Sequence, residues 1–253
     1  MANFINRAAL NKTTFSSSGV GILSYTLHCI TKPARYRGTV LDDGRQVANF
    51  TIECDEKCTD NFQADVDLAL LAGPQASTTK PTYQLRPGGF LLLFDSRYDR
   101  NYQVRLHEIG SEQKSRSIFD TKTLGKGDAY AMSLLRPGEY GGYNTKNKTE
   151  FCLSVLYPPT VSAKKQPDVS QLAPLEIAVS EKGFHPNSAD VLPGQGIVFR
   201  IATPSQIELK LTKAAPEPKR LEATQSTKQA ATPLKKKGKI RHTVQWRRAP
   251  KAK

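Results

Sequence analysis

Hydrophobic and polar residues alternate with a period of two along most of the first 213 positions, and this pattern is typical of half-buried β-strands. Segment 36–54 predicts a hairpin, because Asp43-Gly44 separates two alternating runs and Asp-Gly supplies the positive φ of a tight turn. Further strands are expected within 21–30, 82–96, 101–109, 128–143 and 149–158. Only 64–73 favours a short helix or turn. The pattern therefore predicts an all-β protein built around a β-sandwich, immunoglobulin-like or jelly-roll-like in its strand arrangement.

Two apolar faces stand out in the alternation, and each is expected to pack into the core. The first is formed by Leu23, Tyr25, Leu27 and Cys29. The second is formed by Ala48, Phe50, Ile52 and Cys54. Cys29 and Cys54 are accordingly interpreted as small apolar core residues.

Shifts in composition divide the chain into five expected parts. They are a polar leader (1–20), a sandwich domain (21–157), a linker (158–174), a smaller β unit (175–213), and a basic, largely disordered tail (214–253). Segment 85–106 lines up with 191–211, since both show a Pro-Gly turn, an apolar strand, a polar loop and an alternating strand. This match indicates two similar sandwich units, and the second is short of strands. Residues 239–247 have the alternation to supply one.

Two stretches resemble the cupredoxin-like β-sandwich, and together they cover about half of the chain. Segment 176–201 has an aromatic-x-Pro sequence before a Pro-Gly turn and an apolar strand, and 134–155 contains Pro137-Gly138-x-Tyr140. The resemblance implies a copper site in the loop that follows Tyr140. Residues 141–146 hold no Cys, His or Met, whereas copper requires thiolate and imidazole donors. The expectation is a cupredoxin-like scaffold without copper ligands, and a metal-binding relative stays a third alternative.

Positive charge is concentrated at the C-terminus. The whole chain carries 37 Lys/Arg and 23 Asp/Glu, and residues 211–253 hold 13 of the former and 2 of the latter. The net charge of that segment is therefore +11, while the first 210 residues carry +3. Such an asymmetry indicates an anionic partner.

The basic segment predicts nucleic-acid binding, with no acid between 223 and 253. Its expected phosphate contacts are Lys235, Lys236, Lys237, Lys239, Arg241, Arg247 and Arg248, and Trp246 is available for base stacking. The alternative is a protein-interaction strand, because Ile240, His242, Val244 and Trp246 alternate. The leading hypothesis is a non-enzymatic structural protein that binds nucleic acid or another polyanion within a larger assembly, a ribonucleoprotein or a virion. Other protein subunits are possible partners.

Motifs for catalysis or metal binding are not found. No nucleophile elbow, phosphate loop or helical metal motif is present, and His28, His107, His185 and His242 lie far apart. Cys54-x3-Cys58 is one pair suited to a metal or a bridge, but no compact second pair follows Cys58, so no metal or cofactor is expected. The N-terminus has no secretory h-region, which favours an intracellular protein without a membrane partner. Its acid-free, Ser/Thr-rich start also matches an organellar transit peptide.

Overall fold

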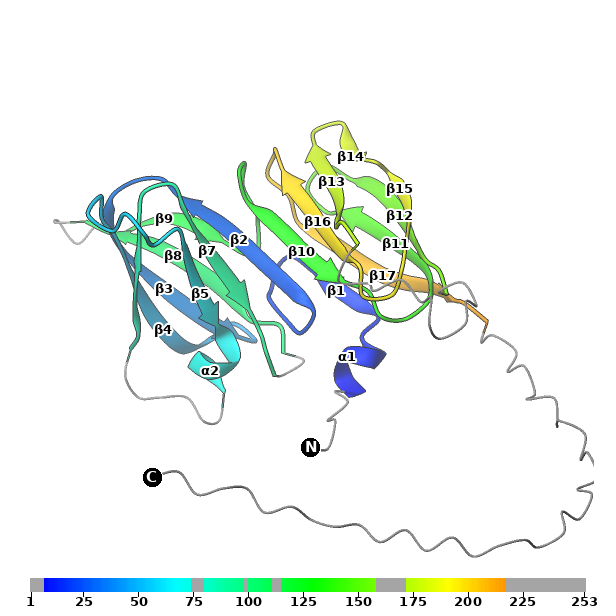
Figure 1. Cartoon of the computed structure of the whole chain (residues 1–253), viewed down its shortest axis with the longest axis horizontal. Helices are drawn as coiled ribbons and strands as arrows, with labels where there is room; N and C mark the ends of the chain where they lie inside the picture. Colours follow the sequence, from blue (N-terminus) through cyan, green and yellow to red (C-terminus); the bar gives the residue numbers. More distant parts are fainter. Residues whose placement is uncertain (1–6, 74–79, 98–99, 111–114, 158–171, 217–253) are drawn as a thin grey trace, which may run out of the picture. The chain divides into compact units, whose positions relative to one another are not determined.

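The part of the chain that the structure describes folds into three β-sheets with two short helices, which confirms the prediction of an all-β, sandwich-like protein (Figure 1). The structure is a computed structural model, and it describes residues 7–73, 80–97, 100–110, 115–157 and 172–216. Residues up to Pro216 form one compact unit. The basic tail, including 239–247, lies outside the described residues.

A seven-stranded sheet runs through the whole compact unit and is shared by two sandwiches. Its strands, in spatial order, are β14 (Gly183–His185), β13 (Leu175–Ser180), β16 (Gly196–Ile201), β10 (Ala129–Ser133), β2 (Ser24–Ile30), β7 (Gly89–Phe94) and β5 (Gln63–Asp67). The antiparallel pair β2–β10 joins the two halves of this sheet.

Two five-stranded outer sheets complete the sandwiches. The first outer sheet has the order β6 (Thr82–Leu85), β4 (Arg45–Cys54), β3 (Ala34–Asp42), β8 (Gln103–Ile109) and β9 (Ser115–Asp120). The second outer sheet has the order β1 (Thr14–Ser16), β17 (Ile207–Ala214), β11 (Gly138–Asn144), β12 (Thr149–Val155) and β15 (Ser188–Val191). The helices are α1 (Arg7–Asn11) and α2 (Leu68–Ala72).

Local sequence signals explain the best-predicted elements. The β3–β4 hairpin turns at Asp43 and Gly44, with φ of 51° and 77°, as the Asp-Gly pair predicts. Helix α2 lies within the predicted segment 64–73, directly after β5. The Asp67 carboxylate accepts a hydrogen bond from the backbone N–H of Ala69, which caps the helix where the strand ends.

The two sandwiches are related by a pseudo-twofold axis at the centre of the shared sheet. β2 and β10 pair so that Thr26 lies opposite Tyr130, 104 positions further along the chain. The same offset of 104 relates Tyr36 to Tyr140, and each tyrosine hydroxyl donates to the carbonyl four residues before it. Segments 14–42 and 118–146 share five identities at this offset: Phe15/Phe119, Gly21/Gly125, Pro33/Pro137, Tyr36/Tyr140 and Gly38/Gly142. The topology therefore extends the expected repeat from 85–106 and 191–211 to the whole compact unit.

The two repeats exchange their first strands. β1 precedes β2 in the chain but pairs with β17 of the second repeat, and β9 precedes β10 but pairs with β8 of the first. This exchange differs from the expected division of the chain. The proposed leader 1–20 supplies β1, and 175–213 shares both of its sheets with strands of 21–157. β1 pairs with the edge of β17 that does not pair with β11. Phe15 of β1 is buried in the second sandwich as a result.

The core confirms one predicted apolar face and contradicts the other. Phe50, Ile52 and Cys54 are buried as expected. Tyr25 is 40% exposed, however, and Leu27 and Cys29 are only partly buried, because this face of β2 points away from the first outer sheet. The inward face of β2 carries Thr26 and Ile30 instead. The prediction that Tyr25, Leu27 and Cys29 pack into the core was wrong.

Candidate polyanion-binding groove

The predicted nucleic-acid contacts lie outside the described residues. These are Lys235, Lys236, Lys237, Lys239, Arg241, Trp246, Arg247 and Arg248. The described part of the chain ends at Pro216, two residues after β17. Within it, the structure reveals a basic groove that the sequence reading missed.

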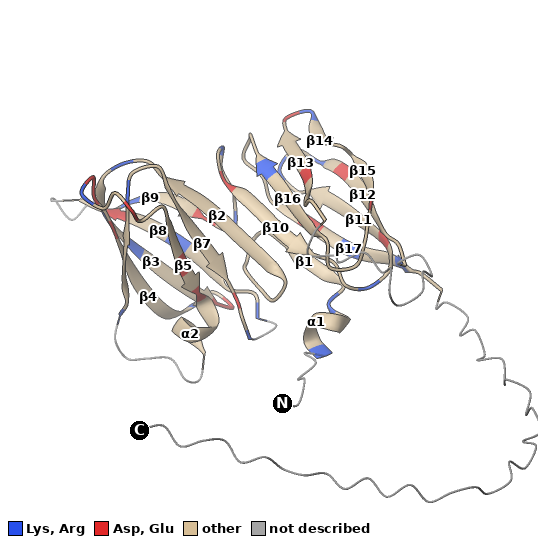
Figure 2. Cartoon of the chain, in the orientation of Figure 1, with Lys and Arg blue, Asp and Glu red and all other residues tan. Residues whose placement is uncertain are grey.

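A groove of about 780 Å³ lies on the outer face of the first outer sheet. Its cationic lining, Arg35, Arg37 and Lys80, comes from β3 and the segment before β6, β8 adds His107, and the basic residues of β3 are drawn in blue in Figure 2. The residues that line it are Arg35, Arg37, Thr39, Gln46, Asn49, Phe50, Thr51, Lys80, His107, Ile109 and Gly110. None of these described lining residues is acidic. The groove thus combines fixed positive charge with hydroxyl and amide groups that can bind anionic oxygens.

Strand register places Arg37 at the centre of this face. Arg37 on β3 lies opposite His107 on β8 and opposite Thr51 on β4. One row along, Thr39 lies opposite Asn49. Because side chains alternate across a strand, these residues point to the same side of the sheet. A planar guanidinium flanked by an imidazole and short polar side chains suits a phosphate or sulfate group.

The cations of the groove are only partly neutralised. Arg35 pairs with Glu53 at 3.5 Å, and both side chains are largely exposed to solvent. Arg37 is exposed and makes no ion pair or hydrogen bond within the described residues. The Nδ1 atom of His107 is buried and has no hydrogen-bond partner there. An anionic ligand in the groove would supply acceptors to the Arg37 guanidinium.

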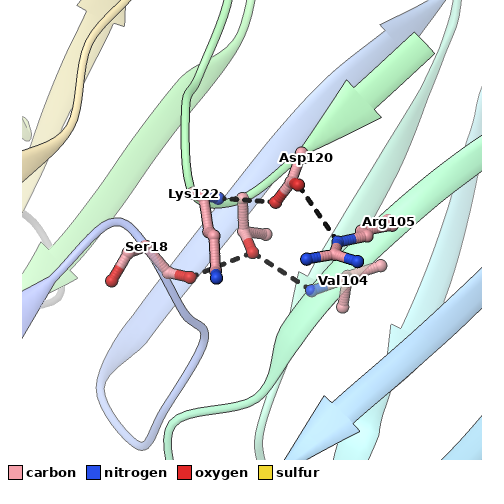
Figure 3. Close-up of polar contacts among 6 residues, drawn as sticks. Ser18, Val104, Arg105, Asp120 and Lys122 are labelled. Atoms are coloured by element: carbon pink, nitrogen blue, oxygen red, sulfur yellow. Dashed lines mark hydrogen bonds and ion pairs between the residues drawn. The ribbon is translucent and has the colours of Figure 1, made fainter. Parts of the chain in front are cut away.

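Neighbouring cations on the same strands are already engaged. The Nε of Arg105 on β8 donates to the Asp120 carboxylate at 3.2 Å, as Figure 3 shows, and Asp120 also accepts the backbone N–H of Lys122. Lys32, just before β3, pairs with Glu108. The uncompensated charge is therefore concentrated around Arg37 rather than spread along the sheet.

The pseudo-equivalent face of the second repeat lacks this character. At the offset of 104 the positions of Arg35 and Arg37 hold Glu139 and Gly141. Lys213 pairs with Glu139 there. The hollow on this second face is lined by Lys12 and Lys210 but also by Glu208, so the two equivalent faces differ in charge.

A second polar cluster lies where the repeats meet. His28 Nδ1 and Asp128 Oδ1 are 2.7 Å apart, Asp128 also accepts the N–H of Gly125, and the His28 ring packs against Phe119. Burial, with a smaller contribution from the Asp128 carboxylate, raises the pKa of the Cys29 thiol. This pair joins β2 to the segment before β10, and its position indicates a structural role.

Metal and membrane sites do not emerge from the described residues. No group of three or more His, Cys, Asp or Glu side chains in this part of the chain could hold a metal ion. Most of the stretch where the cupredoxin resemblance places a ligand loop lies in strand β11, because Gly138–Asn144 pairs with both β12 and β17. Neither described helix is long and apolar enough to cross a membrane.

In comparisons with known proteins, no family model, no curated protein and no solved structure matches the chain.

Proposed function

We propose that this is a non-enzymatic, intracellular structural protein that binds nucleic acid through residues 223–253 as part of a larger assembly. The observation that carries the proposal is the charge distribution, since 223–253 contains ten Lys/Arg and no acid. A chain of this kind releases counterions from a phosphate backbone and binds with little sequence specificity.

The basic groove supports the same proposal from within the fold. It places Arg37, Lys80 and His107 on one face without an acidic lining residue. Among its described lining residues no Phe, Tyr or Trp ring is exposed, because Phe50 is buried beneath the strands. The groove is therefore suited to a sugar–phosphate backbone rather than to stacked bases, and it would hold strand segments that the tail captures.

The test uses the full chain with its tail charges removed. Seven substitutions to Gln at Lys235, Lys236, Lys237, Lys239, Arg241, Arg247 and Arg248 keep the length and the fold. Binding to a fluorescent single-stranded oligonucleotide is measured between low and high salt. The seven tail contacts should contribute about −5 to the wild-type slope of log K against log salt, since each contributes about −0.7.

The outcomes separate the alternatives. Loss of most of the affinity in the Gln variant supports the proposal, and salt-insensitive or unchanged binding contradicts it. If Trp246→Ala abolishes assembly while the Gln variant assembles normally, the segment is a protein-interaction strand instead. A truncation that removes the tail should end after Pro216, because Ala214 on β17 still pairs with Gly138.

A further inference from the structure

The outer face of the shared sheet is apolar across its centre, although it points away from both outer sheets. Strand pairing aligns two rows of side chains on it. One row is Asp67, Phe94, Tyr25, Ala131, Val198 and Glu176. The other is Asp65, Leu92, Leu27, Ala129, Arg200 and Ala178. Tyr25 is 40% exposed, and Phe90, next to these rows, is 43% exposed.

The extent of this face approaches that of a protein interface. Strands lie about 4.8 Å apart and rise about 3.3 Å per residue, so the six strands from β13 to β5, over five residues, span roughly 500 Å² of projected area. Because side chains project from the sheet, the accessible surface area of the face is larger than this projected area. A standard interface takes about 800 Å² of accessible surface from each partner.

Side-chain size divides the face at the pseudo-twofold axis. The half on β2 and β7 carries the large residues Tyr25, Leu27, Leu92 and Phe94. The half on β10 and β16 carries Ala129, Ala131 and Val198, with Arg200 as its one large side chain in these rows. Such a face is complementary to a second copy of itself. A twofold axis parallel to the strands places the large half of one copy over the small half of the other.

We propose that two copies of the chain associate through these faces, related by a twofold axis parallel to the strands. Phe94 of each copy then lies over Val198 of the other, and Tyr25 over Ala131. The packing is that of two sheets face to face, about 10 Å apart.

Charges at the rim are mixed under this axis. It brings Asp65, exposed on β5, over β13 and beside Arg200 of the second copy, and in the other row it brings Asp67 over Glu176, whose carboxylate is already paired with Arg200. Arg200 donates two hydrogen bonds to Glu176, from Nε and Nη2, and its guanidinium retains further N–H donors for a second carboxylate. An axis perpendicular to the strands would instead place β5 over β5 and oppose their aspartates.

The test measures the mass of the full chain in solution by light scattering and sedimentation, after nuclease treatment and in high salt so that nucleic acid cannot bridge copies. The wild type is expected as a dimer of twice 27.9 kDa. Val198→Trp fills the small half and should weaken the dimer at least tenfold. Adding Phe94→Ala should restore the dimer, since these two side chains, three strands apart within one chain, meet only between copies.

Control variants keep the result interpretable. Ser154→Trp adds the same bulk to the outward side of β12 and should leave the dimer intact, and thermal unfolding checks that every variant is folded. A wild type that stays monomeric at about 100 µM, where even micromolar affinity would populate a dimer, overturns the proposal. A dimer that tolerates Val198→Trp also overturns it, and a face covered by the chain's own tail would appear as the monomer.

Discussion

Ser17 and Thr121 occupy equivalent places in the two repeats, and each ties an exchanged strand to its new sandwich. The Ser17 hydroxyl accepts the backbone N–H of Ile207, and the Thr121 hydroxyl accepts that of Val104. Thr121 also donates to the carbonyl of Ser18, which links the two exchange points directly, and Figure 3 shows Ser18 and Val104 on either side of this link. Both hydroxyl residues are fully buried.

Thr121→Val should therefore lower the free energy of unfolding by about 2–3 kcal/mol, because it leaves a buried N–H and a carbonyl without their partner. Valine keeps the shape of threonine, so the decrease in the free energy of unfolding measures the lost hydrogen bonds and not a cavity. Urea denaturation measures it. Thr82→Val, at an exposed position on β6, is the matched control and should change little. Equal stability of the two variants would show that Thr121 does not hold the exchange.

The period-two pattern predicted most strands and the Asp43-Gly44 hairpin, because these depend on neighbouring residues. The strand exchange could not be predicted in this way. β1 is three residues long, and its partner Leu209 lies far along the chain from Phe15. Nothing local in so short a segment identifies its partner.

The error at β2 has a different cause. Alternation shows which residues share a face, but not which of two faces is buried. β2 has apolar Tyr25 and Leu27 on one side and Thr26 and His28 on the other, so the more hydrophobic side was wrongly predicted to be buried.

The groove could not be predicted for a related reason. Arg35 and Arg37 alternate visibly on one strand, but Lys80 and His107 join them only through pairing of distant segments.

Tyr36 makes stability sensitive to high pH. Burial, with smaller contributions from Cys54 and Glu108, raises its pKa from 10.0 to about 12. Since the folded state favours the neutral phenol, this stabilisation is complete below pH 10 and is lost as the pH rises towards 12. Unfolding measured in urea across this range should show a falling stability, to which other buried tyrosines also contribute.

Tyr36→Phe should remove part of that alkaline loss and, at neutral pH, cost about 1 kcal/mol for the hydrogen bond from the hydroxyl to the Lys32 carbonyl. Tyr140→Phe is the matched variant in the second repeat, where the hydroxyl donates to the Arg136 carbonyl. An unchanged pH profile in Tyr36→Phe would show that Tyr36 does not titrate with unfolding.

Gly38 and Gly142 each lie beneath an aromatic ring on the neighbouring strand. A Cβ atom on Gly38 would come within 2.2 Å of the Phe50 ring, and one on Gly142 within 2.1 Å of the Phe151 ring. Gly38→Ala should therefore destabilise the fold by about 1–3 kcal/mol through overpacking. Adding Phe50→Leu should recover part of the loss, as thermal unfolding would show. Gly125→Ala, whose Cβ would meet its nearest neighbour at 3.7 Å, should be tolerated.

Arg37 should contribute to polyanion binding independently of the tail. Arg37→Ala in the full chain removes one phosphate contact, so the slope of log K against log salt should become shallower by about 0.7–0.9, with an unchanged melting temperature. Asn49→Asp places a carboxylate on the same face and should weaken binding further. Arg45→Ala makes the same charge change at an exposed hairpin position outside the groove lining. If Arg45→Ala weakens binding as much as Arg37→Ala, the fold contributes only net charge, and the ligand does not enter the groove.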